Sequence, residues 1–183
     1  KIIPDFGKYD NVILGAGIEL ASHGDHGFTQ TLISTLRNTG STKVFGYIDL
    51  GFRSKSASGS YNWYAQYTPS QLENRINGWK ELGVHGIFLD NFGADYHDGH
   101  NSRDKQTLGV NAVRNAGLLL AVNAWNPDDV FGPSEDGSDS VIGQNDIYMS
   151  ESFMLNEELG IDRQKQDGEY NWWKKAEKIQ KYR

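Results

Sequence analysis

Short apolar runs, each closed by a polar residue, recur along the chain. The five clearest runs are Asn11–Ile18, Lys43–Leu50, Val84–Asp90, Gly117–Asn123 and Asp146–Glu151. Continuous apolar runs of this length are typical of parallel strands that are buried on both faces. The pattern therefore predicts five parallel strands.

Segments with helical periodicity lie between and after these runs. The predicted helices are Thr29–Asn38, Pro69–Leu82, Arg103–Ala116 and Tyr170–Tyr182. The second is the best defined, because Thr68 suits an N-cap, Pro69 suits the first helical position and Gly83 follows the end. Strands that alternate with helices predict a parallel sheet with right-handed crossovers.

The spacing of the strands favours an α/β fold of the (β/α) TIM type. The strand starts recur about every 34 residues, close to the roughly 31 residues per unit of an eight-unit barrel. A doubly wound open sheet has a similar rhythm, but no strand is followed by the G-x-G-x-x-G fingerprint of dinucleotide-binding folds. Since only about five βα units are visible, we expect a partial or truncated barrel.

This barrel-like domain is expected to span residues 1–183 as a single domain and to be part of a longer chain. The first residue is Lys1 rather than an initiator Met, which indicates a processed or excised segment. Further domains or chains would supply the missing barrel units. Two polar stretches, Arg53–Tyr67 and Ser134–Ser140, are expected to be loops.

Composition narrows the functional classes. The net charge is −6 and no Lys/Arg cluster is present, so the electrostatic footprint of a nucleic-acid-binding protein is missing. The absence of cysteine excludes disulfides, thiolate zinc sites and Cys nucleophiles. No apolar run is long enough to span a bilayer. An acidic surface would also tolerate a cationic polymer.

Polar residues end four of the predicted strands. They are Asp49, Asp90, Asn123 and Glu151. Because strand ends of a barrel meet at one rim, where catalytic residues lie, these four favour a shared site. Each taken alone could also cap the following helix or mark an exit into solvent. Strand alternation adds Tyr47, which shares a face with Asp49.

The carboxylates of Asp90 and Glu151 are the candidate catalytic pair. Glycoside hydrolysis needs one carboxyl group as general acid and a second as nucleophile or base. With strands about 4.8 Å apart, the two could approach within about 5–10 Å, which covers retaining and inverting enzymes. Which of them is the acid stays open. The candidate sugar-binding residues are Tyr47, Asp49, Asn91, Tyr96, Asn123 and Trp125.

Aromatic neighbours could tune the acid of this pair. An acid that donates a proton near neutral pH needs a raised pKa. We expect Phe92, Tyr96 or Trp125 to raise it by desolvation.

Three runs resemble glycoside hydrolase family 114 and spherulin-4-like barrels. They are Val44–Leu50 (VFGYIDL), Gly83–Asn91 (GVHGIFLDN) and Tyr148–Phe153 (YMSESF), and the resemblance covers residues 43–153. It implies a (β/α)8 fold that acts on galactosamine-containing polysaccharides without a cofactor. It also implies a catalytic Asp at one strand end and a catalytic Glu at the end of the strand after next. Asp90 and Glu151 occupy the matching positions.

Other constellations carry less weight. His97, His100 and the carboxylates Asp95, Asp98 and Asp104 could bind a metal, but a Gly-rich polar segment is more commonly a solvated loop, and we predict no metal site. The aromatic residues Trp63, Tyr64 and Tyr67 could form a stacking platform for sugar rings.

Two functional hypotheses follow. The first is a secreted or cell-surface glycosidase of bacterial type that cleaves an amino-sugar polysaccharide internally, like an endo-α-1,4-polygalactosaminidase. The second is a non-catalytic carbohydrate-binding or structural barrel module of a larger surface or phage protein, because fold alone does not determine function.

Overall fold

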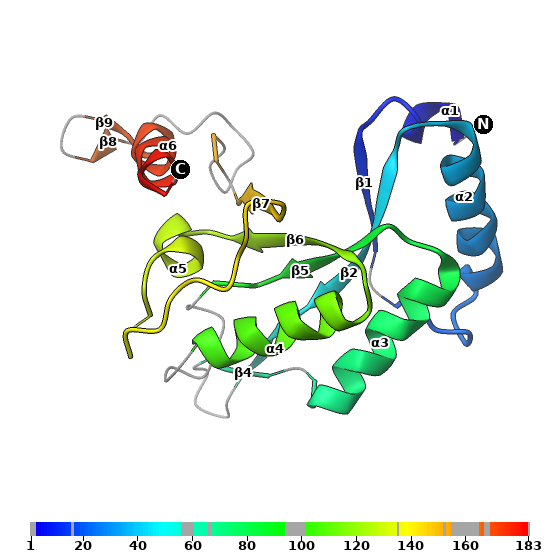
Figure 1. Ribbon diagram of the computed structural model, residues 1–183, viewed down its shortest axis with the longest axis horizontal. Helices are drawn as coiled ribbons and strands as arrows, with labels where there is room; N and C mark the ends of the chain where they lie inside the picture. The colour runs from blue at the N-terminus through cyan, green and yellow to red at the C-terminus, as the bar shows by residue number, and fades with distance from the viewer. Residues whose placement is uncertain are drawn as a thin grey trace.

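A parallel five-stranded sheet lies at the centre of the molecule (Figure 1). The computed structural model describes residues 3–15, 17–55, 61–65, 67–93, 102–134, 136–151, 153–154, 165–166 and 169–182. The strands lie in the order β1 (Asn11–Leu14), β2 (Lys43–Asp49), β5 (Gly86–Asp90), β6 (Leu119–Ala124) and β7 (Ile147–Ser150). All neighbours pair in parallel. The sheet curls into a half-barrel, and the five predicted strands are confirmed.

Helices connect these strands. The three long ones are α2 (His26–Thr39), α3 (Pro69–Leu82) and α4 (Ser102–Asn115), and they lie along the convex side of the sheet (Figure 1). The remaining elements are α1 (Ile3–Phe6), α5 (Pro127–Phe131), β8 (Lys165–Gln166), β9 (Glu169–Tyr170) and α6 (Asn171–Lys181). Among the described residues, no helix is long and apolar enough to cross a membrane.

One predicted loop contains regular structure. The stretch Arg53–Tyr67 was expected to be irregular, but β3 (Gly51–Lys55) and β4 (Tyr61–Ala65) pair in it as an antiparallel hairpin. The stretch lacks the continuous apolar run by which the other strands were predicted, but it is rich in aromatic residues, which favour strands. The backbone hydrogen bonds of such a pair form whatever the local polarity is, which is why a hydrophobic pattern misses it.

Helix α3 has the boundaries that the sequence predicts. The Thr68 amide donates to Gln71 Oε1 at 2.9 Å, and the Gln71 amide donates to Thr68 Oγ1 at 3.4 Å, which together form a capping box. Gly83 ends the helix at φ 87°, and its amide donates to the carbonyl of Lys80. A glycine suits this left-handed position because it carries no Cβ.

The main core lies between the convex face of the sheet and the helices. Trp79 of α3 is fully buried there, and its indole Nε1 donates to the carbonyl oxygen of Tyr47 at 3.2 Å. A Cβ on Gly46 of β2 would overlap the Trp79 ring. The glycine thus lets the helix approach the strand closely and anchors β2 against α3.

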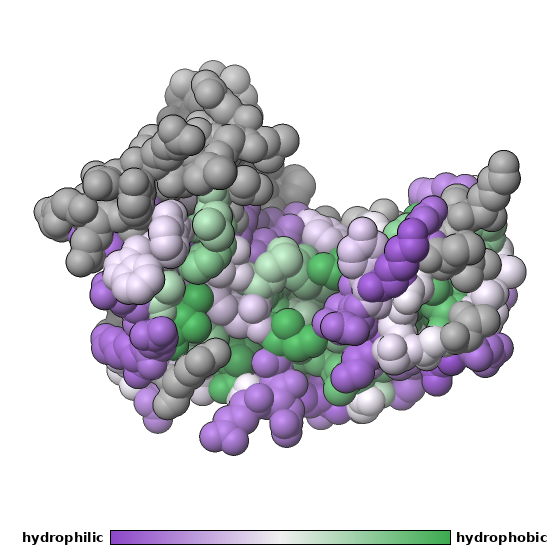
Figure 2. All heavy atoms as spheres, turned by 90° about the horizontal axis from the view of Figure 1, so that it is seen from above, coloured by the Kyte–Doolittle hydropathy of each residue, from purple (hydrophilic) through white to green (hydrophobic). Residues whose placement is uncertain are grey.

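The concave face of the half-barrel is only partly covered. Phe45, Phe88 and Ala121 form a small buried cluster beside Tyr47. Large apolar side chains around it stay 37–42% exposed: Ile13, Leu119, Ile147 and Met149. Figure 2 shows exposed hydrophobic side chains within this hollow. Since a closed barrel fills its interior with side chains, the described chain leaves an incompletely buried interior face.

The close contact between Gly46 and Trp79 makes a stability prediction. Gly46→Ala should lower the free energy of unfolding by about 1–3 kcal/mol, because the added methyl group overpacks the core. Gly27→Ala is the matched control, since a Cβ there meets no atom within 4 Å. Urea-induced unfolding of both variants provides the measurement. An equal effect of the two substitutions would contradict the packing argument.

Candidate functional site

The carboxyl ends of four neighbouring strands place polar residues on one rim. Asp49 of β2 pairs in register with Asp90 of β5. Asn123 of β6 pairs with Met149 of β7, and Glu151 follows two positions later. Parallel pairing thus brings together the four strand-end residues that the sequence singles out, on the concave face of the sheet.

Three hydrogen-bond donors converge on the carboxylate of Asp90. The Tyr47 hydroxyl donates to Oδ2 at 2.6 Å, the Asn123 side-chain amide donates to Oδ1 at 2.8 Å, and the backbone amide of Asn91 donates to Oδ1 at 2.9 Å. An ionised carboxylate only accepts hydrogen bonds. Asp90 is therefore held in one orientation by groups from three strand ends.

Asn91 joins this carboxylate to a second one. Its backbone has φ 52°, a left-handed conformation that Asn tolerates better than most residues. Its side-chain amide donates to Asp49 Oδ1 at 2.6 Å, and the Gly51 amide donates to the same oxygen at 2.9 Å. Burial raises the pKa of Asp49 and the charge of Asp90 adds to the rise, while the two hydrogen bonds oppose it.

Glu151 occupies a different environment. Its backbone amide donates to the carbonyl of Ala124 at 3.3 Å, so the turn after β7 continues the sheet. Burial raises the pKa of Glu151, and the negative charge of Asp90 raises it further. The Lys175 ammonium and a hydrogen bond with Asn123 lower this pKa, but the net shift is upward.

Two side-chain oxygens near this carboxyl group are buried without a hydrogen-bond partner in the described part of the chain. They are Glu151 Oε2 and Asn123 Oδ1. Buried polar atoms are nearly always satisfied in proteins, so unsatisfied ones call for an explanation. A protonated carboxyl group or a bound substrate hydroxyl would satisfy them.

Two tyrosines, one on β2 and one on β7, keep their protons at neutral pH. Burial and the hydrogen bond to Asp90 raise the pKa of Tyr47. Burial raises the pKa of Tyr148 to about 12, and its hydroxyl donates to the Ala124 carbonyl at 3.0 Å. The donor that Tyr47 presents to Asp90 is therefore permanent at physiological pH.

The C-terminal helix reaches the same rim. Lys175 of α6 donates to the backbone carbonyl of Glu151 at 2.8 Å, and its ammonium lies 3.4 Å from the ring centroid of Trp125. Trp125 follows β6 and is 47% exposed. The ammonium covers one face of the indole, and about half of the side chain remains exposed.

A second set of contacts holds α6 in place. Asp128 of α5 forms an ion pair with Lys178 at 2.6 Å and accepts a hydrogen bond from Tyr182 at 2.8 Å. Sequence reasoning missed this contribution, because no motif links the last helix to the strand ends. The usable signal was the spacing of Lys175, Lys178 and Tyr182, which puts all three on one helical face.

Several other candidates have a different placement. Tyr96 and the His97–His100 segment lie outside the described residues, and only the backbone of β4, with Trp63 and Tyr64, is described. Phe92 packs in the main core between sheet and helices. Tyr67 lies against Arg75, with the guanidinium 5.7 Å from its ring centroid. Within the described ranges, no cluster of three or more His, Asp or Glu residues could hold a metal.

The fold and the rim together define an α/β protein with a carboxylate-lined site at the strand ends. Comparison with known proteins gives no matching family model and no matching curated protein. The functional argument therefore depends on the geometry and electrostatics of the rim.

The donors of Asp90 generate a prediction about stability. Tyr47→Phe should lower the free energy of unfolding by about 1.5–3 kcal/mol at neutral pH, because it removes a hydrogen bond to a charged group. Tyr148→Phe removes a hydrogen bond to a neutral carbonyl and should cost about 0.5–1.5 kcal/mol. Denaturant unfolding of both variants tests the order, and a smaller loss for Tyr47→Phe would contradict the described geometry.

Proposed function

We propose that this chain carries the catalytic rim of a (β/α) barrel glycoside hydrolase that cleaves an amino-sugar polysaccharide. One observation carries the proposal: two carboxyl groups from alternate strands, Asp90 and Glu151, occupy contrasting environments on one rim. Asp90 accepts three hydrogen bonds, whereas Glu151 is half-buried and has a raised pKa. In glycosidases, different environments shift the pKa values of two carboxyl groups apart, so that one is protonated and acts as the acid while the other is ionised.

This contrast assigns the two roles. Glu151 acts as the general acid and gives its proton to the glycosidic oxygen as the bond from that oxygen to the anomeric carbon breaks. Asp90, held by its three donors, faces the positive charge that develops on the sugar ring. Tyr47 and Asn123 hold Asp90 in position through their hydrogen bonds. This chemistry requires no cofactor.

The surroundings of the pair support an amino-sugar substrate. Asp49 adds a third carboxyl group to the rim, and the chain has a net charge of −6. Among the described rim residues, carboxyl groups outnumber the ammonium of Lys175, and a site of net negative charge raises the local concentration of a polymer of opposite sign. Asn91 and Trp125 would bind hydroxyl groups and a ring face. Such a polymer is an extracellular material, so we propose a secreted or cell-surface location.

The open concave face favours a second candidate function, that of a non-catalytic module whose barrel is completed by another domain or chain. Ile13, Leu119, Ile147 and Met149 are partly exposed there, and β1 and β7 are the edges of the sheet. A TIM-type barrel has eight strands and buries such side chains. On this hypothesis, further domains or chains supply the missing strands, and the rim binds polysaccharide without cleaving it.

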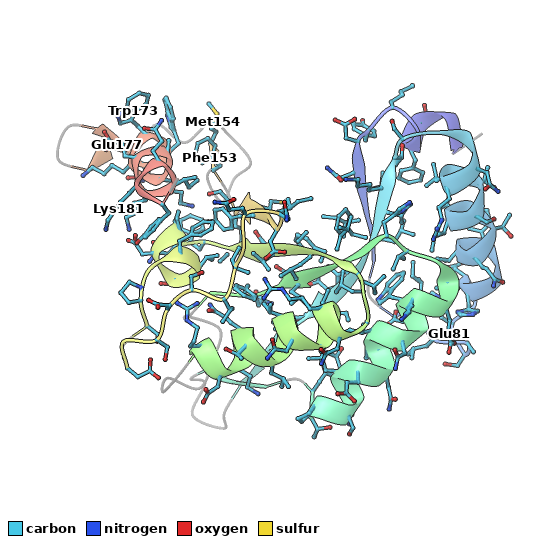
Figure 3. The ribbon with its side chains drawn as sticks, in the orientation of Figure 1. Glu81, Phe153, Met154, Trp173, Glu177 and Lys181 are labelled. Atoms are coloured by element: carbon cyan, nitrogen blue, oxygen red, sulfur yellow. The ribbon has the colours of Figure 1, made fainter. Side chains whose placement is uncertain are left out.

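Substitution of the carboxyl groups tests the catalytic proposal. Asp90→Asn and Glu151→Gln should each reduce the release of reducing ends from galactosaminogalactan by about 10²-fold or more, the usual contribution of a general acid or of a group that stabilises charge in the transition state. Glu81→Gln is the matched control, because Glu81 lies on α3 far from β7 (Figure 3) and should leave the rate unchanged. Binding without turnover by the parent protein would favour the module. Turnover that survives both substitutions would refute the site.

The raised pKa of Glu151 predicts a pH dependence. A general acid must be protonated in order to act. Because the pKa of Glu151 is raised above the ordinary value of 4.5, Glu151 keeps its proton at pH values where an ordinary glutamate has lost it. We expect kcat/KM to fall on the alkaline side, with the midpoint of the fall above pH 4.5. A midpoint at or below 4.5 would rule out Glu151 as the acid.

A further inference from the structure

Lys175 of α6 contacts both a candidate catalytic residue and a candidate sugar-binding residue. Its Nζ donates to the Glu151 carbonyl oxygen at 2.8 Å. The same ammonium lies 3.4 Å from the centroid of the Trp125 ring, within range of a cation–π interaction. A single side chain from a distant helix thus bridges the turn after β7 and the residue after β6.

The position of Lys175 is determined by the docking of α6. Lys178 forms its ion pair with Asp128 and donates to Asn126 Oδ1 at 3.1 Å. The rings of Tyr182 and Phe131 stack with centroids 5.6 Å apart. These contacts attach the C-terminal part of α6 to α5 over about one turn. The ammonium of Lys175 therefore reaches the rim from a helix that has its own contacts with the rest of the fold.

Few charged groups face the Glu151 carboxyl group within the described residues. Asp90 approaches from β5 and disfavours its ionised form, and Lys175 approaches from α6 and favours it. Tyr148 of β7 is also close enough to interact with Glu151, but it remains neutral over the relevant pH range. Lys175 is therefore the cation that counterbalances Asp90 at Glu151.

We propose that Lys175 is a positioning residue of the rim, which ties the turn at Glu151 to Trp125 and sets the balance of charge around the Glu151 carboxyl group. This inference rests on the proposed function, because it assigns Lys175 a role through Glu151. Removal of the ammonium leaves Asp90 unopposed and favours the protonated form of Glu151. The docking of α6 therefore sets the highest pH at which Glu151 remains protonated and can act as the general acid.

Titration of Glu151 by NMR tests this role without any substrate. The side-chain carboxyl carbons of glutamate are labelled with ¹³C, and the Glu151 signal is assigned by its loss in Glu151→Gln. Lys175→Met should shift the titration midpoint of Glu151 upward, and Lys175→Arg should restore it close to that of the parent. Lys181→Met is the matched control, because it removes the same charge from the side of α6 turned away from β7 (Figure 3) and should leave the midpoint unchanged.

The outcomes separate this inference from the proposed function. An unchanged midpoint in folded Lys175→Met, or an equal shift in Lys181→Met, would overturn the role of Lys175. Lys175→Arg keeps the charge, so its parent-like midpoint distinguishes an electrostatic effect from a loss of folding. If the parent shows no turnover while the midpoint shifts as expected, the hydrolase proposal fails and the charge coupling stands. In an active parent, the alkaline limb of the pH–rate profile should move upward with the midpoint.

Discussion

Parallel register among β2, β5, β6 and β7 is the constraint on which the rim depends. Side chains alternate between the two faces of a strand, so a slip of one residue would turn Asp90 toward the helices and Leu89 toward the hollow. The apolar residues of the convex face oppose such a slip, because they are buried under α3 and α4. The close contact of Trp79 with Gly46 likewise opposes a shift of β2 relative to α3. Packing on one face of the sheet thereby positions the polar chemistry on the other.

Burial and like charge act together on the rim. Asp49, Asp90 and Glu151 share it, and the raised pKa values of Asp49 and Glu151 have the same two causes. Three hydrogen-bond donors converge on Asp90 among them, and hydrogen bonds to a carboxylate are among the strong ones. The arrangement surrounds one carboxyl group with donors and leaves a neighbouring one with a raised pKa. This contrast is what glycosidic bond cleavage requires.

The C-terminal helix extends the site beyond the sheet. Because α6 docks through Asp128 and the aromatic pair of Phe131 and Tyr182, it contributes Lys175 without belonging to a strand–helix unit. The concave face, in contrast, leaves apolar side chains exposed near the edges of the sheet. The described residues thus form the rim and leave the concave face of the half-barrel open.

Local patterns in the chain were enough to predict the five strands, the boundaries of α3 and the polar strand ends, because hydrophobic periodicity and capping involve residues that are close in sequence. Since parallel strand ends share an edge, the same patterns indicated that Asp49, Asp90, Asn123 and Glu151 would meet. They did not reveal the β3–β4 hairpin, the donors of Asp90 or the contact of Lys175 with Glu151, which depend on how distant segments pack. The last of these joins residues 24 positions apart through the docking of a whole helix. No local pattern encodes such a contact, because its energy comes from packing and desolvation that exist only in the folded chain.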